Sequence, residues 1–299
     1  MQASQIGVAN QSIIEMEEAE IAMSLSRPVS AMAVLWATIV KELRTARRYL
    51  PNLIGNIAQL GIRLLFFLLL ANIASFQGSE SLGRPMTGRD LFIFFQGALL
   101  LFVFKGTALW TPLNAVSRDL YNGTLEFLYS NPFSRYAYFA GTVVSDIIIA
   151  QVAFLPIFVL LTIYSQIDFG NMLMILLVCL STFATLLAMG VMIALLGILW
   201  RQASSIAGIL EISFEMLAGA YFPIQAFPLP LQYFAYILPF TWGYDLIRYY
   251  SFNGEWHTLV PVWQEWTILL LFAATYTAVS IYLLQRVERY AKKNGLHLI

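Results

Sequence analysis

The sequence predicts an all-α integral membrane protein, and three observations carry this prediction. Apolar residues make up 59% of the 299 residues, whereas charged residues make up only 11%. Six apolar stretches are long enough to cross a hydrocarbon core of about 30 Å as helices that rise about 1.5 Å per residue. Lys and Arg residues gather on alternate sides of these stretches. The stretches lie near residues 52–76, 91–116, 137–165, 171–199, 203–220 and 264–285.

The distribution of basic residues predicts the orientation of the chain. In membrane proteins, Lys and Arg accumulate in the short connections on the cytoplasmic side. Only Arg84, Arg89 and Arg248 fall on the opposite side of the predicted layout. We therefore expect a multi-pass protein of the plasma (inner) membrane with both termini in the cytoplasm. The basic residues on the predicted cytoplasmic side are Arg27, Lys41, Arg44, Arg47, Arg48, Arg118, Arg135, Arg201, Arg286, Arg289, Lys292 and Lys293.

Composition argues against several other classes of protein. Because 17 basic residues balance 17 acidic ones, nothing favours nucleic-acid binding. One cysteine and two histidines give no basis for a disulfide framework or a metal site. Residues 1–27 are polar and lack the apolar core of a signal peptide, so we expect a flexible cytoplasmic tail, with either Met1 or Met23 as its start. Residues 28–299 are expected to form a single six-helix domain.

Residues 30–50 predict an amphipathic helix at the membrane interface. Its apolar residues recur every three or four positions, and its cations gather on the other face. Pro51 is expected to end this helix before the first span. The helix is either a generic membrane anchor or an elbow that also contacts a partner protein. The apolar positions are Met32, Leu35, Trp36, Ile39, Leu43, Ala46 and Leu50, and the cations are Lys41, Arg44, Arg47 and Arg48.

The inner connection, residues 117–135, is less polar than a simple linker needs to be. Asn122-Gly123 is a turn signal, and Asn131-Pro132 stops whatever precedes it. Between them, residues 124–129 suit one or two helical turns with an acidic residue near the start.

Two further connections constrain the packing. The one near residues 165–170 is so short that the third and fourth spans should form an antiparallel hairpin. Small residues such as Gly190 on the fourth span allow close helix packing. The outer segment, residues 221–263, interleaves prolines with aromatic residues and predicts short helices that dip into the outer leaflet and return. Aromatic rings at that depth are also ordinary interface anchors.

Five ionisable residues fall inside the predicted spans. From the cytoplasmic ends, Arg63, Lys105, Asp146 and Glu211 lie at depths of roughly 13–17 Å, and Glu215 at about 20 Å. Glu211 and Glu215 share one helix face, and Lys105 is the cation closest to them in depth. The second and fifth spans are therefore predicted to be neighbours. These charges are structural ion pairs, the polar lining of a transport route, or a proton relay.

The order and spacing of three motifs make the chain resemble the ATP-binding-cassette type-2 exporter permeases over residues 28–290. The motifs are Lys41-Glu42-Leu43-Arg44 before the first span, Gly123-Thr124-Leu125-Glu126 followed by Pro132 in the inner connection, and Gly219-Ala220-Tyr221-Phe222-Pro223 leading to Leu238-Pro239-Phe240-Thr241 and Arg248.

This resemblance implies an assembly of two permeases, either two copies or a copy and a paralogue, with two ATPase subunits that hold ATP and Mg²⁺. It implies that the second and fifth spans lie near the dimer seam. The paired Glu211 and Glu215 are not a pattern of the whole family. The implied ATPase-coupling residues are Lys41, Glu42, Arg44, Arg118, Asp119, Gly123, Thr124, Leu125 and Glu126, and the implied outer lid contains Phe222, Pro223, Pro228, Pro239 and Arg248.

The chain itself carries no phosphate-binding motif of the Gly-x-x-x-x-Gly-Lys-Ser/Thr type, since none of its four lysines follows a glycine. We therefore expect no bound cofactor and no catalytic residues in this chain. The expected function is export of an amphiphile (a drug, a lipid or a lipid-linked glycan) driven by a separate ATPase. The rivals are an ion-driven secondary transporter, an intramembrane enzyme and a scaffold subunit; the enzyme lacks a His-Glu-x-x-His motif and a histidine in the spans.

Overall fold

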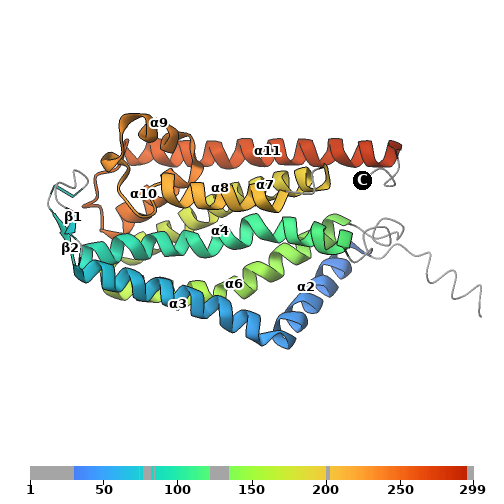
Figure 1. Ribbon diagram of the computed structural model, residues 1–299, viewed down its shortest axis with the longest axis horizontal. Helices are drawn as coiled ribbons and strands as arrows, with labels where there is room; N and C mark the ends of the chain where they lie inside the picture. The colour runs from blue at the N-terminus through green and yellow to red at the C-terminus, as the bar shows by residue number, and fades with distance from the viewer. Residues whose placement is uncertain are drawn as a thin grey trace, which may run out of the picture.

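The computed structural model describes residues 30–73, 75–76, 82–83, 85–121, 135–199 and 203–294. The described chain is helical apart from two short strands, which confirms the predicted all-α class (Figure 1). The predicted tail over residues 1–27 and the predicted helical turns over residues 124–129 lie outside the described residues.

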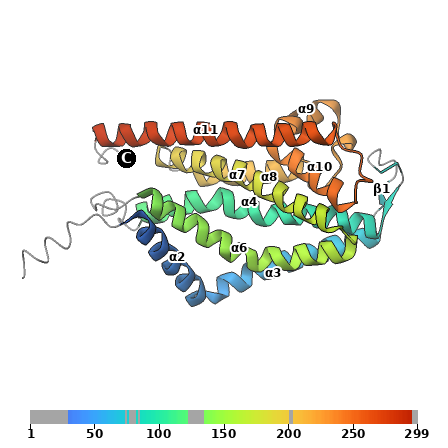
Figure 2. The same ribbon diagram turned by 180° about the vertical axis from the view of Figure 1, so that it is seen from behind.

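Helix α2, Ala31–Arg48, is the predicted amphipathic helix. The Ser30 hydroxyl caps its start by accepting a hydrogen bond from the Ala33 N–H at 3.2 Å. The helix ends at Arg48, and its cap Tyr49 leaves the helical conformation with a φ of −105° and a ψ of 45°. A helix that ran on through Pro51 would lose an N–H donor and clash with the preceding turn, which accounts for the break. Pro51 instead lies in the first turn of α3, where its missing N–H leaves no bond unmade. Helices α2 and α3 meet at an angle in both views (Figures 1 and 2).

Among the described residues, five helices are long and apolar enough to cross a membrane. The fifth predicted span, residues 203–220, corresponds to α8, Ala203–Leu217, whose 15 residues extend only about 22 Å, so the predicted count of six spans is not confirmed. Gly219 turns the chain just beyond α8 with a φ of +87°, a conformation that favours glycine. The five long helices are α3 (Leu50–Ile73), α4 (Arg89–Tyr121), α6 (Arg135–Ser165), α7 (Phe169–Leu199) and α11 (Val262–Asn294).

Helix α4 lies at the centre of the fold. It packs against α3, α6, α7, α8 and α10, and its buried side chains, including Leu99 and Leu100, form much of the core. Its candidate membrane span, Arg89–Ala115, agrees with the predicted span near residues 91–116. The helix itself continues to Tyr121, into the connection predicted to begin at residue 117, although Pro112 lies within it.

Helices α6 and α7 are joined at Gln166, which has a φ of 52°, by a connection as short as predicted. They do not pack along each other as the predicted hairpin, because each packs against α4 instead. Helix α7 also approaches α4 closely at Gly190, where an added Cβ would collide with the backbone carbonyl of Ala108. The small residue is therefore required for this packing, as in other membrane helix pairs.

The two ends of the molecule differ in structure. One end, here the β1–β2 end, carries the antiparallel strands β1 (Ser75–Phe76) and β2 (Met86–Thr87), with Ser75 opposite Thr87. The short helices η1 (Ile224–Ala226), α9 (Leu229–Ile237) and α10 (Pro239–Ser251) lie toward the same end (Figure 1). The other end, here the α2 end, carries α2 and the last residues of α11 (Figure 2).

Candidate functional site

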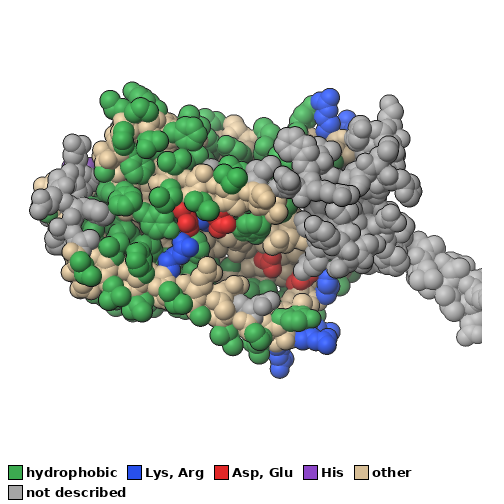
Figure 3. All heavy atoms as spheres, viewed as in Figure 1, with side chains coloured by type: hydrophobic (Ala, Val, Ile, Leu, Met, Phe, Trp, Pro, Cys, Tyr) green, Lys and Arg blue, Asp and Glu red, His purple; other side chains and the backbone are tan. Residues whose placement is uncertain are grey.

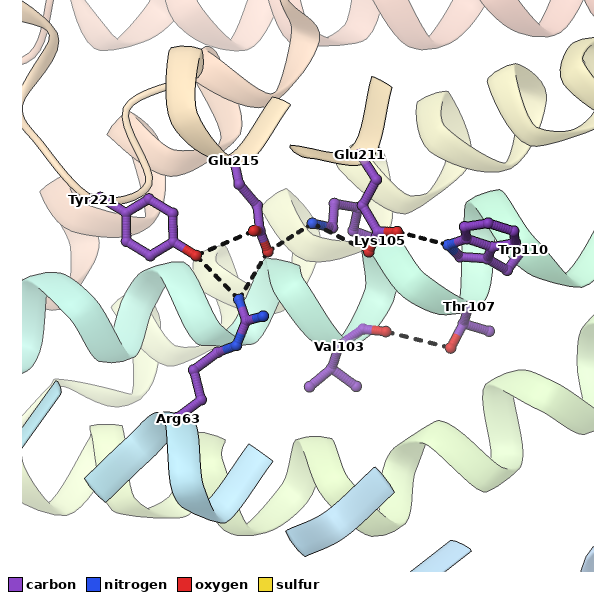
Figure 4. Close-up of polar contacts among 8 residues, drawn as sticks. All are labelled: Arg63, Val103, Lys105, Thr107, Trp110, Glu211, Glu215 and Tyr221. Carbon is purple, nitrogen blue, oxygen red and sulfur yellow. Dashed lines mark hydrogen bonds and ion pairs between the residues drawn. The ribbon is translucent and has the colours of Figure 1, made fainter. Parts of the chain in front are cut away.

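Four of the five predicted intramembrane charges meet in one cluster, here called the central ion network: Arg63 on α3, Lys105 on α4, and Glu211 and Glu215 on α8 (Figure 4). Glu215 Oε1 lies 2.9 Å from Arg63 Nη1 and 2.8 Å from Lys105 Nζ. Lys105 Nζ is 3.5 Å from Glu211 Oε1. Helices α4 and α8 are therefore neighbours, as the sequence predicted.

Two aromatic side chains complete the hydrogen bonding of the carboxylates. Tyr221 Oη donates to Glu215 Oε2 at 3.1 Å and accepts from Arg63 Nη1 at 3.1 Å. Trp110 Nε1 donates to Glu211 Oε2 at 2.8 Å. Sequence reasoning assigned no role in the network to either ring, because an aromatic residue in a membrane span has no distinctive pattern.

The ring of Phe102 supports both cations of the network. The Arg63 guanidinium lies 3.8 Å from its centroid and the Lys105 ammonium 4.8 Å. Two positive groups beside one ring are compatible here because two carboxylates lie next to them. The network thus contains two cations and two acids whose formal charges cancel.

The network is buried in its interior and partly open at both ends. The Lys105 side chain, between the two carboxylates, is fully buried, whereas 26% of the Arg63 side chain and 23% of the Glu211 side chain remain exposed. Acidic and basic side chains accordingly reach the surface together near the middle of one face, beside apolar side chains of α3 and α8 (Figure 3). The arrangement forms a polar patch next to these apolar side chains.

Asp146, the fifth predicted charge, belongs to a different contact. Its Oδ2 accepts a hydrogen bond from Thr111 Oγ1 at 2.6 Å, which links α6 to α4. Its depth was predicted together with the others, but its helix places it on another side of α4. The structure does not bring it into the central ion network.

The predicted outer lid forms η1 (Ile224–Ala226), α9 (Leu229–Ile237) and α10 (Pro239–Ser251). Pro223 and Pro228 cap the first two of these helices and Pro239 begins the third, so each proline marks a start. Phe222 is exposed. In contrast, twelve of the 13 residues of α10 are buried.

Arg248 joins this lid to the end of α8. Its Nη2 donates to the carbonyl oxygens of Gly219 at 2.6 Å and Ala220 at 3.2 Å, and its guanidinium lies 3.6 Å from the centroid of the Phe94 ring. Because Tyr221 follows directly, the lid and the central ion network share one short segment of chain.

Other buried polar groups of this region were not predicted from the sequence. Asp245 on α10 accepts from Trp256 Nε1 at 2.8 Å and from the Leu259 N–H at 2.9 Å. The fully buried Glu265, in the first turn of α11, accepts from the Val260 N–H at 3.4 Å. Asp245 falls in the predicted outer segment and Glu265 at the edge of the predicted last span, where an acid carries no signal of burial, so the sequence could not reveal that they are buried.

Of the predicted coupling residues, those on α2 are well defined. Lys41 Nζ lies 3.1 Å from Glu42 Oε1 and 3.5 Å from Tyr138 Oη on α6, while Glu42 is buried. Partial burial on its own lowers the pKa of Lys41. The hydrogen bond and charge of Glu42, together with the contact to Tyr138, raise this pKa by more than burial lowers it, so it lies above its ordinary value. Arg44 is exposed.

The remaining predicted coupling residues lie in the last turns of α4 or beyond its end. Arg118 and Asp119 lie in its last turns at the α2 end, although they were predicted to belong to a loop. Gly123, Thr124, Leu125 and Glu126 lie outside the described residues.

Comparison with protein families identifies the class. The family described as ABC-2 type transporter matches residues 30–252, which is more than half of the chain. The match begins at the cap of α2 and ends at the cap of α10. The chain therefore belongs to the ABC-2 type transporter family, as a multi-pass transmembrane permease component of an ABC transporter. A comparison with curated proteins finds no match.

Proposed function

We propose that this permease exports an amphiphilic substrate, such as a drug, a lipid or a lipid-linked glycan, from the cytoplasm. The single observation that carries the proposal is the central ion network, a charge-balanced polar patch beside apolar side chains of α3 and α8 (Figure 3). A charge in a membrane span is costly unless it is paired or lines a polar route. Here the charges are paired and partly exposed at once, which suits a surface along which a polar head group moves.

The central ion network would also allow α8 to move. Glu215 is shared by a cation on α3 and a cation on α4, so α8 can shift by exchanging partners without leaving a carboxylate unpaired. A transporter that alternates between inward-open and outward-open states needs two packings of similar energy. A second copy of the chain, or a paralogue, would face this patch and complete the route.

Energy would come from a separate ATPase subunit that binds at the α2 end. Helix α4 runs unbroken from Asp119 at that end to Lys105, a distance of about 21 Å. A push on the end of α4 is therefore transmitted directly to the network. Helix α2 gives a second route through its contact with α6. In this proposal the α2 end and both termini face the cytoplasm, and the membrane is the plasma (inner) membrane.

The proposal is tested in vesicles that contain the permease with or without its ATPase. Uphill movement of a fluorescent phospholipid and of a fluorescent amphiphilic dye should require both ATP and the ATPase. Glu126→Arg and Gly123→Pro should each abolish substrate-stimulated ATP hydrolysis and leave membrane insertion intact. Uphill transport by the permease alone, or transport that needs only a proton gradient, would favour an ion-driven transporter instead.

A further inference from the structure

The four charges of the central ion network form a row in which the signs alternate. Glu215 lies 2.9 Å from Arg63 and 2.8 Å from Lys105, and Lys105 in turn lies 3.5 Å from Glu211. A cation therefore ends the row on α3 and an acid ends it on α8 (Figure 4). The inner side chains, Lys105 and Glu215, are 0% and 13% exposed, and the two end side chains are more exposed than either. The ends that reach the surface thus carry opposite charges.

The Arg63 end keeps an unused pair of hydrogen-bond donors. Its Nη1 donates to both Glu215 and Tyr221, and the Phe102 ring lies against the guanidinium. Nε and Nη2 have no hydrogen-bond partner in the part of the chain that the structure describes (Figure 4). Two adjacent N–H groups of a guanidinium bind two oxygens of a phosphate or a carboxylate at once. The free edge of Arg63 therefore fits an oxyanion.

The Glu211 end keeps unused hydrogen-bond acceptors. Its Oε2 accepts from Trp110 Nε1 at 2.8 Å, and its Oε1 lies 3.5 Å from Lys105 Nζ. A carboxylate offers about four acceptor positions, so some of those on this partly exposed side chain are unused. An ammonium group, which carries three donors and a positive charge, fits beside them.

Both ends lie within reach of one head group, since three short contacts join Arg63 to Glu211, the longest of them 3.5 Å. The network is neutral as a whole. A head group with a net charge would leave one charge uncompensated inside the membrane, which is costly. An uncharged head group would provide no counter-charge at either end. A head group with one anion and one cation extends the alternation at both ends and keeps the sum at zero.

Apolar side chains lie beside the patch on both helices that carry its ends (Figure 3). Ile62 and Phe66 on α3 are exposed, as are Ile212 and Met216 on α8. These side chains suit contact with acyl chains, which gain dispersion energy against such a surface. The patch and its surroundings together match an amphiphile with a dipolar head.

We propose that the two exposed ends of the central ion network bind a zwitterionic head group, with its phosphate at Arg63 and its ammonium at Glu211, as in a phosphatidylethanolamine lipid. This proposal rests on the export function proposed above, because the lipid bound here is taken to be the exported substrate. It narrows that substrate from amphiphiles in general to those with a dipolar head group of zero net charge.

The test is native mass spectrometry of the full chain in a non-ionic detergent, without ATP or the ATPase. Four lipids with identical acyl chains are titrated singly: zwitterionic phosphatidylethanolamine, anionic phosphatidylglycerol, a cationic aminopropanediol diester and uncharged glucosyl diacylglycerol. Phosphatidylethanolamine should bind the wild type about tenfold more tightly than each of the others, the difference expected from one additional charge-assisted hydrogen bond.

Two charge variants should change this order in opposite directions. Glu211→Gln gives the network a net positive charge, so phosphatidylglycerol should become the tightest ligand. Arg63→Gln gives it a net negative charge, so the cationic lipid should become the tightest. A general loss of stability would not produce opposite preferences. Glu255→Gln and Arg286→Gln are the matched controls, because they change exposed residues outside the network, and both should keep the wild-type order.

The proposal is overturned if any of the other three lipids binds the wild type as tightly as phosphatidylethanolamine, or if both charge variants keep the wild-type order. The wild-type comparison decides alone if a variant does not fold. Transport is a separate measurement. Selective binding without ATP-driven movement of a fluorescent phosphatidylethanolamine in vesicles would refute export and support the head-group site. ATP-driven movement without selective binding would support export and refute the head-group site.

Discussion

The central ion network and the polar groups of α10 both place charge inside an apolar protein, but they hold it differently. In the network, carboxylates and cations from α3, α4 and α8 bond one another through side chains, and several remain partly exposed. On α10, Arg248 and Asp245 are 2% and 3% exposed and bond backbone groups, with Trp256 as an additional donor to Asp245.

This difference indicates which region can move. A side chain that bonds a backbone carbonyl is fixed unless the chain itself refolds, so α10 is held rigidly against the end of α8. Side chains that bond one another can exchange partners at little cost while the charges stay balanced. We infer that the lid is an anchor and that the network is the adjustable part.

The largest expected effect is the loss of the anchor. Arg248→Met should lower the free energy of unfolding by about 3 kcal/mol, because the carbonyls of Gly219 and Ala220 lose their donor and each buried orphan costs roughly 1–3 kcal/mol. Thermal unfolding of the purified protein measures the change. Arg286→Met is the control, since Arg286 is exposed and its bonding partner among the described residues is Tyr282. Equal stability of the two variants would show that Arg248 is no anchor.

The second prediction distinguishes a purely structural role of the central ion network from a role in transport. Lys105→Met should destabilise the protein by about 2–3 kcal/mol, because Glu211 is left without a described cation and keeps the bond from Trp110, while Glu215 still has Arg63. Adding Glu215→Gln should recover at least about 1 kcal/mol of this loss, as expected for directly paired residues. Substrate-stimulated ATP hydrolysis should nevertheless stay low in the double variant. Wild-type coupling in that variant would assign the network a purely structural role.

Much of the fold follows from hydropathy, whereas its exceptions follow from local backbone chemistry. The apolar stretches locate α3, α6, α7 and α11 well because a membrane helix must be apolar along its length. Hydropathy overestimates α8, because the turn at Gly219 depends on backbone conformation. Hydropathy also does not show that α4 continues beyond Ala115, because the residues that extend this helix outside the apolar core are polar.

For the candidate site, sequence gave the layer of the charges but not their direction around each helix. Depth and the spacing of Glu211 and Glu215 were enough to predict their contact with Lys105. The same depth argument included Asp146, which points instead to Thr111. Rotation about a helix axis is set by packing with several neighbours at once, and one sequence does not encode that as a local pattern.

A smaller effect should come from the joint between α2 and α6. An added Cβ at Gly141 would lie 2.8 Å from Thr38 Cβ and 2.9 Å from the Leu35 carbonyl oxygen, so Gly141→Ala must displace α2. We expect about 1–2 kcal/mol of destabilisation and weaker stimulation of the ATPase. Gly106→Ala is the control: it has open space and should stabilise helix α4 by up to about 1 kcal/mol. Unfolding and ATPase assays on both variants test the joint, and identical behaviour would show that α2 is not held by this contact.

The smallest expected effect is at Lys41, and its pH dependence has a definite sign. Because the folded pKa lies above the ordinary value of 10.5, the ammonium is charged in both folded and unfolded chains at neutral pH. Its contribution is therefore complete below the unfolded pKa and is lost only as the pH rises through the folded pKa. More than half of the side chain is exposed, so Lys41→Gln should cost less than about 1 kcal/mol. That cost, measured by thermal unfolding, should be constant between about pH 6 and pH 9. A cost that grew or vanished within that interval would mean that another titrating group controls the contact between α2 and α6.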